Sequence, residues 1–226
     1  MSRPWPLLVF DWDGTLMDST TAIVRAAQAA IADLGLPLRS DADICGIIGL
    51  GLRESWETLF PELDADAYED FVDSYRDHFL LRERARSRLY PGVREVLVVL
   101  RERDCRLAVA TGKSRRGLDY DLESTGLGEL FDATRTADET RSKPHPEMLL
   151  DLMAHLGFGP EQTLMVGDTE FDLQMAQAAG ASALALTWGA HPESRLRAHG
   201  PAACLDDIGQ IPAWLEQIEA ELAEGG

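Results

Sequence analysis

The chain of 226 residues has no asparagine, and it has few lysines and few cysteines. Because asparagine is absent, the sequence contains no acceptor for N-linked glycosylation. The cysteines, Cys45, Cys105 and Cys204, form no CxxC pair, which argues against a zinc or redox motif and favours idle thiols in a reducing compartment. No apolar run reaches the roughly 18 residues of a membrane-spanning helix, and the apolar run near the amino terminus is too short for a signal peptide. These absences predict a cytoplasmic protein that does not bind membranes.

Positive charge is also scarce. The chain has 21 Lys and Arg against 39 Asp and Glu, a formal net charge of −18. This field repels polyanions, so we expect no nucleic-acid partner, and an anionic substrate would need a local site that attracts it. Hydrophobic residues make up 45% of the chain and charged residues 27%, which is typical of a globular protein with a substantial core.

Short apolar segments without polar alternation recur at residues 6–10, 107–110, 163–166 and 183–187. Segments of this kind are typical of strands buried on both faces of a parallel sheet. Helix-like patterns follow them at residues 114–125, 146–156, 170–179 and 208–222. The alternation predicts an α/β fold with a doubly wound, Rossmann-like parallel sheet.

The alternation stops between the first two predicted strands. Residues 19–88 contain helix-like patterns and no buried strand, so we expect an inserted α-helical cap domain there and a core formed by residues 1–18 and 89–226. The expected cap helices cover residues 20–34, 53–60 and 67–86. The aromatic residues of the cap form either its own core or a pairing surface, which leaves monomer and homodimer open. These residues are Trp56, Phe60 and Phe71.

The first strand runs directly into DWDGTLMD, so Asp11 and Asp13 lie at the carboxyl edge of the sheet, where open α/β folds bind their ligands. Two carboxylates one residue apart on an extended chain point in different directions, so one can act as nucleophile and the other as proton donor and acceptor. Gly14 permits a tight turn, and Thr15 can hold a backbone or phosphate group. An Asx turn before a helix cap would explain part of this segment without catalysis.

The second strand runs into TGKS at residues 111–114. This is not a P-loop, because Leu107 stands where that motif needs glycine. The Thr111 hydroxyl and the amides that follow it, including that of Gly112, can bind an anion such as phosphate at a helix amino terminus. An ordinary helix N-cap explains the same residues.

The only two lysines, Lys113 and Lys143, stand among 19 arginines. Lysine carries a compact ammonium group on a flexible stem, whereas arginine carries a planar guanidinium. Because the chain otherwise uses arginine, the two lysines suggest that these positions need an ammonium group. Lys143 lies in RSKPHPEML, where Pro144 and Pro146 keep the loop extended, and we expect it to be functional. Lys113 is either a substrate contact or a surface residue.

Another strand ends in GDTEFD, which places Asp168 and Asp172 at the same carboxyl edge. If a helix starts near Thr169, Asp168 is its cap and Asp172 lies one turn inside it. Carboxylates that converge from two strands repel one another unless a cation neutralises them, and an all-oxygen set suits Mg²⁺. The five histidines show no spacing typical of a zinc site.

Taken in order, DWDGTLMD, VATGKS, KPHPEML and MVGDTEFD resemble the four motifs of the haloacid dehalogenase superfamily. The resemblance is to the Mg²⁺-dependent phosphatases with a helical cap inserted after the first strand, with phosphoglycolate phosphatase-like members the most similar. It extends from Val9 to Asp172. It implies hydrolysis of a small phosphorylated metabolite, with phosphoglycolate as the first candidate.

By this resemblance, Asp11 attacks phosphorus to form an aspartyl-phosphate, and Asp13 protonates the leaving alkoxide and later activates water. Thr111 and the Gly112 amide hold phosphate oxygens, and Lys143 pairs with Asp11 and the transferring group. These roles agree with the physical demands of phosphoryl transfer, which are positioning and charge neutralisation.

The resemblance also implies that Asp11, Asp168 and the backbone carbonyl of Asp13 bind Mg²⁺ and that Asp172 supports this set. Arg53 in the cap segment IIGLGLRES is the candidate substrate contact, although a helix-capping turn explains that segment equally well. The arginines of residues 82–88 either draw in an anion or form a solvated helix face.

Two other functions fit part of the pattern. A phosphomutase of the β-phosphoglucomutase type would use the same phosphoenzyme and return the phosphoryl group to a sugar. A non-catalytic signalling module similar to response-regulator receivers would accept phosphate on Asp11, but such modules lack the cap and the acid at the position of Asp13.

Overall fold

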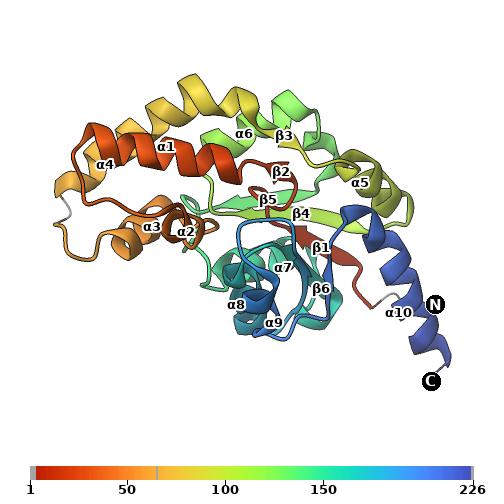
Figure 1. Cartoon of the computed structure of the whole chain (residues 1–226). Helices are drawn as coiled ribbons and strands as arrows, with labels where there is room; N and C mark the ends of the chain where they lie inside the picture. Colours follow the sequence, from red (N-terminus) through yellow and green to blue (C-terminus); the bar gives the residue numbers. More distant parts are fainter. Residues whose placement is uncertain (1–3, 65, 225–226) are drawn as a thin grey trace.

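The computed structural model describes residues 4–64 and 66–224 of the chain. Its centre is a six-stranded, entirely parallel sheet with the order β5-β4-β1-β6-β7-β8 (Figure 1). The strands are β1 (Leu7–Phe10), β4 (Arg106–Thr111), β5 (Ala133–Thr136), β6 (Thr163–Gly167), β7 (Ser182–Leu186) and β8 (Ala203–Leu205). The chain first builds outward from β1 to β5 and then restarts on the other side of β1, so the strand order reverses between β1 and β6. Ligands of doubly wound folds bind at such a reversal, and the predicted α/β architecture is confirmed.

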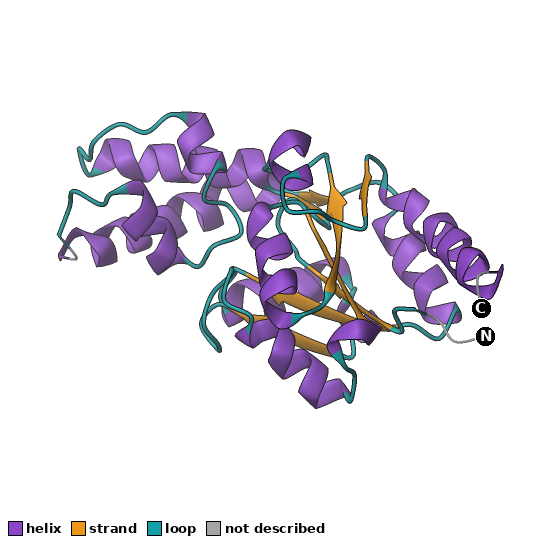
Figure 2. Cartoon of the chain, turned by 90° about the horizontal axis from the view of Figure 1, so that it is seen from below, coloured by secondary structure: helices purple, strands orange, loops and turns teal. Residues whose placement is uncertain are grey.

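Helices cover both faces of the sheet, as Figure 2 shows. The side chains of β1 alternate between the two layers: Leu8 and Phe10 belong to one apolar cluster, and Leu7 and Val9 belong to the other. Because both faces are covered, the strand is apolar throughout and has no exposed side. One layer contains α5 (Val93–Glu102), α6 (Arg115–Thr125) and α10 (Ile211–Glu224), and the other contains α7 (Glu147–Leu156) and α8 (Glu170–Ala179). The short α9 (Glu193–Arg197) packs beside α8 and β8.

The structure adds two edge strands that the apolar pattern does not predict. β5 has the sequence ATRT and is only half-buried over most of its length, and β8 has three residues. An edge strand has one neighbour and partial exposure, so it lacks the continuous apolar run of a central strand.

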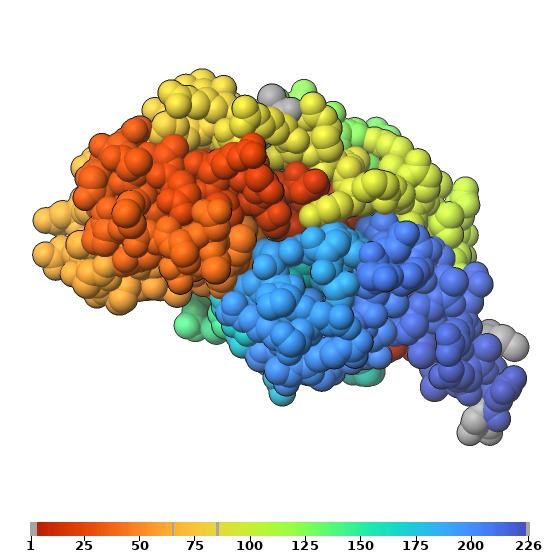
Figure 3. Space-filling model, viewed as in Figure 1, coloured from red at the N-terminus to blue at the C-terminus, as the bar shows by residue number. Residues whose placement is uncertain are grey.

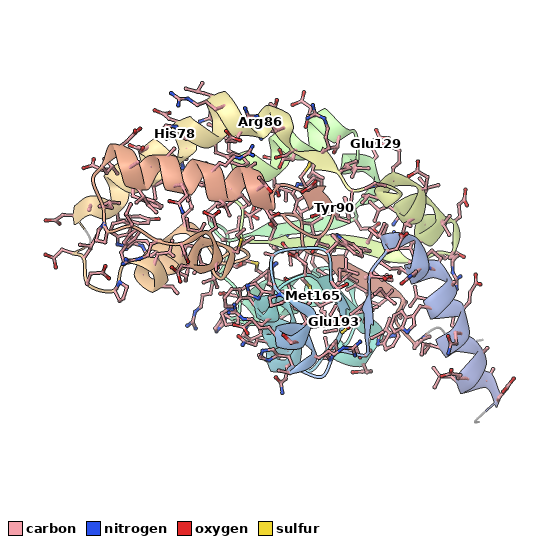
Figure 4. The ribbon with its side chains drawn as sticks, in the orientation of Figure 1. His78, Arg86, Tyr90, Glu129, Met165 and Glu193 are labelled. Atoms are coloured by element: carbon pink, nitrogen blue, oxygen red, sulfur yellow. The ribbon has the colours of Figure 1, made fainter. Side chains whose placement is uncertain are left out.

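The helical cap lies between β1 and β4, as predicted, and it forms the orange and yellow lobe of Figure 3. Its regular helices are α1 (Thr20–Asp33), α2 (Asp41–Cys45), α3 (Leu52–Leu59) and α4 (Asp66–His78). The expected single helix over residues 67–86 is wrong, because α4 ends at His78 and continues as a π-helical segment, Phe79–Glu83, and a 3₁₀ turn, Arg84–Arg86. Figure 4 labels His78 and Arg86 along this run.

The chain leaves and re-enters the core through a small antiparallel pair, β2 (Met17–Asp18) and β3 (Arg88–Leu89). Asp18 is opposite Arg88 in this pair. The cap therefore begins and ends at one point on the core, close to Tyr90 in Figure 4.

The aromatic residues of the cap form its own hydrophobic core. Trp56, Phe60 and Phe71 are almost fully buried, and the ring centroids of Trp56 lie 4.7 Å from Phe60 and 5.4 Å from Phe71. They are thus packed inside the cap and are not available as a pairing surface. All three cysteines are free thiols. Over residues 4–64 and 66–224, the helices are too short or too polar to cross a membrane.

Candidate active site

Three carboxylates meet where the strand order reverses. Asp11 follows β1, and its amide donates a hydrogen bond to the carbonyl of Val166 in β6 at 2.9 Å. Asp168 follows β6, and Asp172 lies in the first turn of α8. One oxygen atom from each of Asp11, Asp168 and Asp172 lies within 4.8 Å of the others, and all three residues are buried.

Lys143 supplies the positive charge at this cluster. Its Nζ atom lies 2.8 Å from Asp11 Oδ1 and 2.6 Å from Asp172 Oδ1, and the side chain is fully buried. When all three carboxylates are ionised, they face one ammonium group, which leaves two negative charges to be neutralised. Burial raises the pKa of Asp11 well above its usual range despite the nearby Lys143, and burial together with Asp172 raises the pKa of Asp168 to about 7.

Uncharged hydrogen-bond donors hold Asp168 and the second oxygen atom of Asp172. Asp168 accepts hydrogen bonds from the Thr15 hydroxyl at 2.6 Å and the Ala190 amide at 2.7 Å. Asp172 Oδ2 accepts from both the amide and the hydroxyl of Thr169. Thr169 is the N-cap of α8, so the expectation that Asp168 caps this helix is wrong. The cap is displaced by one residue, and Asp168 is thereby left free to face the site.

Gly14 is required by the same arrangement. Its φ angle is +83°, and a Cβ atom there would overlap the carboxylate of Asp168. The tight turn after β1 and the approach of Asp168 therefore both depend on the missing side chain.

Asp11 is the member of the cluster with unused hydrogen-bonding capacity. Both of its carboxylate oxygens are buried, and neither has a hydrogen-bond partner of acceptable direction, although Lys143 forms a close ion pair with one of them. A buried acceptor without a partner is costly, so this carboxylate is suited to an electrophile or a cation. Together with the excess of two negative charges, it makes the cluster a fitting site for a divalent cation bound by oxygen.

Asp13 faces different partners from Asp11, as expected for two residues one position apart on an extended chain. Its Oδ1 atom accepts a hydrogen bond from the Ser19 hydroxyl at 2.6 Å. Lys113 Nζ lies 3.1 Å from Oδ1 and 3.0 Å from Oδ2. The two acids therefore sit in separate environments within one site.

Lys113 is not a surface residue. Besides Asp13, its Nζ atom contacts Asp121 of α6 at 3.1 Å, and these carboxylates raise its pKa against the opposing effect of burial. Asp121 also accepts a hydrogen bond from Arg84 of the cap at 3.0 Å. A chain of alternating charges thus runs from Asp13 through Lys113 and Asp121 to the cap.

The loop after β4 lies against the cap. Thr111 is buried, and its hydroxyl accepts a weak hydrogen bond from the amide of Lys113 at 3.3 Å. A Cβ atom on Gly112 would lie 2.6 Å from the carbonyl oxygens of both Gly49 and Leu50. Only glycine allows this close approach of the cap loop to the core.

Asp11, Asp13, the loop after β4 and the cap loop at Gly49 open into one cavity of about 720 Å³ between the core and the cap, and Asp168, Asp172 and Lys143 are not among its lining residues. Asp11, Asp13, Thr111, Gly112 and Lys113 line its core side. Arg53 is not among the lining residues. Its guanidinium is stacked on the ring of Tyr68, 4.4 Å from the centroid, on the cap surface.

The model of the haloacid dehalogenase-like hydrolase family matches residues 8–186 of this chain. The chain belongs to this family. A Dickeya dadantii protein named probable phosphatase IndB is 36% identical over 212 residues, which is 91% of each chain. The phosphoglycolate phosphatase of Nitrosococcus oceani is 30% identical over 217 residues, covering 93% of this chain and 96% of its own length. The crystal structure of a haloacid dehalogenase-like hydrolase from Bacteroides fragilis covers 92% of this chain and 99% of its own, with 28% identity and a TM-score of 0.85.

In this haloacid dehalogenase-like hydrolase, three residues near the site were not predicted as site residues from the sequence. Ser19, Asp121 and Arg84 contact the predicted residues or link them to the cap. Ser19 directly follows the first motif and stands at the N-cap position of α1, but its hydroxyl makes no capping hydrogen bond and donates to Asp13 instead. Arg84 is 37 residues from Asp121 in the sequence, so the tertiary fold alone brings these two side chains together. The contact between Lys113 and Asp121 likewise cannot be read from a motif.

Proposed function

We propose that this haloacid dehalogenase-like hydrolase is a Mg²⁺-dependent phosphatase that hydrolyses a small phosphate monoester through a covalent aspartyl-phosphate. The observation that carries the proposal is Asp11: a buried carboxylate without hydrogen-bond partners, beside Lys143 and two further carboxylates. The relatives named phosphatases support the reaction class.

In the first step, an Asp11 oxygen attacks phosphorus, and the bond between phosphorus and the alcohol oxygen breaks. The leaving alkoxide takes a proton from Asp13. Lys143 keeps Asp11 oriented through the 2.8 Å ion pair and offsets charge on the phosphoryl group.

In the second step, Asp13 removes a proton from water, and the hydroxide attacks phosphorus and releases Asp11 and inorganic phosphate. Ser19 holds the Asp13 carboxylate through its 2.6 Å hydrogen bond. The Thr111 hydroxyl and the Gly112 amide, which line the cavity, hold the other phosphate oxygens.

Asp11, Asp168 and the main-chain carbonyl of Asp13 would hold Mg²⁺, with Asp172 behind them on Lys143 and Thr169. When bound, the ion would neutralise the excess negative charge of the cluster and of the phosphate. Thr15 contributes indirectly, because its hydroxyl holds Asp168.

The test is phosphate release from a panel of phosphate esters, with Mg²⁺ and with EDTA, by the wild type, Asp11→Asn and Asp13→Asn. We expect Mg²⁺-dependent release that falls by about 10⁴-fold or more in Asp11→Asn. A phosphoryl adduct on Asp11 should accumulate in Asp13→Asn and be visible by intact mass. Full activity in Asp11→Asn would refute the mechanism, and conversion of a hexose 1-phosphate to its isomer would identify a mutase instead.

A further inference from the structure

The cap side of the cavity has a chemistry that the reaction itself does not require. Most of its lining side chains are aliphatic or aromatic, in contrast to the charged core side. The central residues of this apolar wall, as we call it, are Ile23, Ile44, Ile47, Ile48, Phe71 and Phe79. They come from α1, α2, the loop after α2, α4 and the π-helical segment, and α3 adds Leu52 and Leu59 to the apolar lining.

On the cap side of the cavity, the arginines that the structure describes in the lining already face carboxylates. Two cap arginines, Arg76 and Arg84, line the cavity. Arg84 Nη2 lies 3.0 Å from Asp121 and 3.2 Å from the carbonyl of Gly117, and its guanidinium stacks on Tyr120. Arg76 lies 3.9 Å from Asp73 and is half-exposed. On the cap side, a short substrate with a carboxylate at its far end would therefore meet an apolar wall and two arginines that already face carboxylates. The third arginine of the lining, the exposed Arg116 in the first turn of α6, lies on the core side.

The size of the cavity points in the same direction. About 720 Å³ lies within the roughly 300–1,000 Å³ of sites that enclose drug-sized ligands. A two-carbon ester bound at Asp11 would fill little of this space and would leave most of the cap side of the cavity to water.

We propose, on the basis of the function proposed above, that the substrate is a phosphate monoester with a large, mainly apolar leaving group that packs against the apolar wall. The phosphate binds at Asp11, Lys143 and the loop at Thr111. The wall disfavours phosphoglycolate, because its carboxylate would have to lose its hydration against these apolar side chains.

The first experiment measures kcat/KM for ethyl, butyl, hexyl and octyl phosphate and for phosphoglycolate. The four alkyl esters have primary alcohols of nearly equal acidity as leaving groups. Chain length therefore changes the apolar area that the substrate can bury but not the intrinsic reactivity of the ester. We expect kcat/KM to rise with chain length, by up to about fourfold for each methylene that is buried. Phosphoglycolate should be hydrolysed at least about tenfold less efficiently than hexyl phosphate.

Two adjacent leucines provide a matched pair of variants. Leu80 lines the cavity, whereas Leu81 is 80% exposed and does not. Leu80→Ala should lower the ratio of kcat/KM for hexyl over ethyl phosphate by about threefold to tenfold, because three carbon atoms of the wall are lost. Leu81→Ala, which makes the same chemical change, should leave this ratio within twofold of the wild type. Thermal unfolding of both variants shows that they are folded.

A binding measurement separates recognition from catalysis. Alkyl phosphonates, which are not hydrolysed, should bind the Asp11→Asn variant more tightly as the chain lengthens, with an increasingly negative heat-capacity change. Efficiency and affinity that do not change with chain length, or phosphoglycolate as the best substrate, would overturn the inference while leaving the phosphatase intact. A folded protein that releases phosphate from no ester would refute the proposed function itself.

Discussion

The two sides of the cavity contrast in almost every physical property. The core side is lined by Asp11, Asp13 and Lys113, and buried beside Asp11 are Lys143, Asp168 and Asp172. These charged groups are held by ion pairs or hydrogen bonds. The cap side carries the apolar wall, together with a few polar side chains such as Tyr75, Arg76 and Arg84. Contacts on the core side depend on the direction and distance of charged groups, whereas contacts on the cap side depend mainly on the apolar area that a ligand covers.

This contrast teaches how the two tasks of the site are divided. Phosphoryl transfer needs fixed charges, and these sit at or close to the ends of fully buried central strands. Selection of the alcohol needs shape and apolar area, and these are supplied by helices of the cap. Changes on the core side should therefore affect every substrate, whereas changes on the cap side should affect the preference among substrates.

The largest effect should come from Lys143→Gln on the core side. The substitution leaves Asp11 and Asp172 without their ammonium partner in a fully buried site, which costs about 3–5 kcal/mol in the free energy of unfolding. We expect activity toward all esters to fall by about 10³-fold or more. Urea unfolding and phosphate release measure the two effects. A selective loss toward long-chain esters would contradict the division between the two sides.

A smaller effect should follow Ser19→Ala, which removes the 2.6 Å hydrogen bond to Asp13. Asp13 would lose orientation and remain bound to Lys113, so kcat should fall by about tenfold with little change in KM. The pH dependence of kcat, compared with that of the wild type, reports on Asp13 directly. Thr21→Ala, an exposed substitution in the same helix, is the control. An unchanged kcat and pH profile would show that Ser19 has no positioning role.

Asp121→Asn tests the connection between the two sides. Asp121 contacts Lys113 of the core at 3.1 Å and Arg84 of the cap at 3.0 Å, so the variant weakens both contacts at once. We expect KM to rise by about threefold to tenfold and kcat to change less, because the cap is held less firmly over the site. Glu129→Gln removes an exposed charge outside the cavity and serves as the control. An unchanged KM in Asp121→Asn would show that the contacts of Asp121 with Lys113 and Arg84 do not affect substrate binding.

The smallest effect should come from Glu170→Gln, which alters the core outside the cavity lining. The Arg195 side chain, which donates a hydrogen bond to this carboxylate, lowers the pKa of Glu170 to about 2. A lowered carboxyl pKa stabilises the fold above the unfolded pKa of about 4.5, and this contribution disappears as the pH falls toward 2. At pH 7 we expect Glu170→Gln to lower the free energy of unfolding by about 1 kcal/mol, because the pair is partly exposed.

The difference from the wild type should shrink as the pH falls from 4.5 to 2, as measured by urea unfolding at each pH. Phosphate release at pH 7 should stay within twofold of the wild type for short and long esters alike. A difference in stability that does not depend on pH would show that the ion pair is not its cause.

The core was predictable from the sequence because its signals are local. Central strands are apolar throughout, and the acids of DWDGTLMD and GDTEFD follow two of them directly, so parallel strands bring them to one edge. Lys143 was noticeable because lysine is rare in this chain. The edge strand β5 was missed because Thr134 and Arg135 are half-exposed and carry no apolar run.

The cap side was less predictable because its contacts depend on packing between distant segments. The helical repeat of residues 67–86 does not show that the helix changes at Phe79 or that Leu80 and Arg84 line the cavity. The expected contact of Arg53 stays a prediction without support in the geometry, since that side chain stacks on Tyr68. Sequence periodicity gives the faces of a helix but not the neighbour against which each face packs.

The β2-β3 pair has a consequence for how such enzymes diversify. Because Asp18 and Arg88 are register partners, the ends of the whole cap are as close as the two ends of an ordinary hairpin loop. A recombination event that exchanges the segment between them therefore replaces the selective lobe without cutting the six-stranded sheet or separating its acids. The same catalytic scaffold can in this way acquire a different preference in a single genetic step.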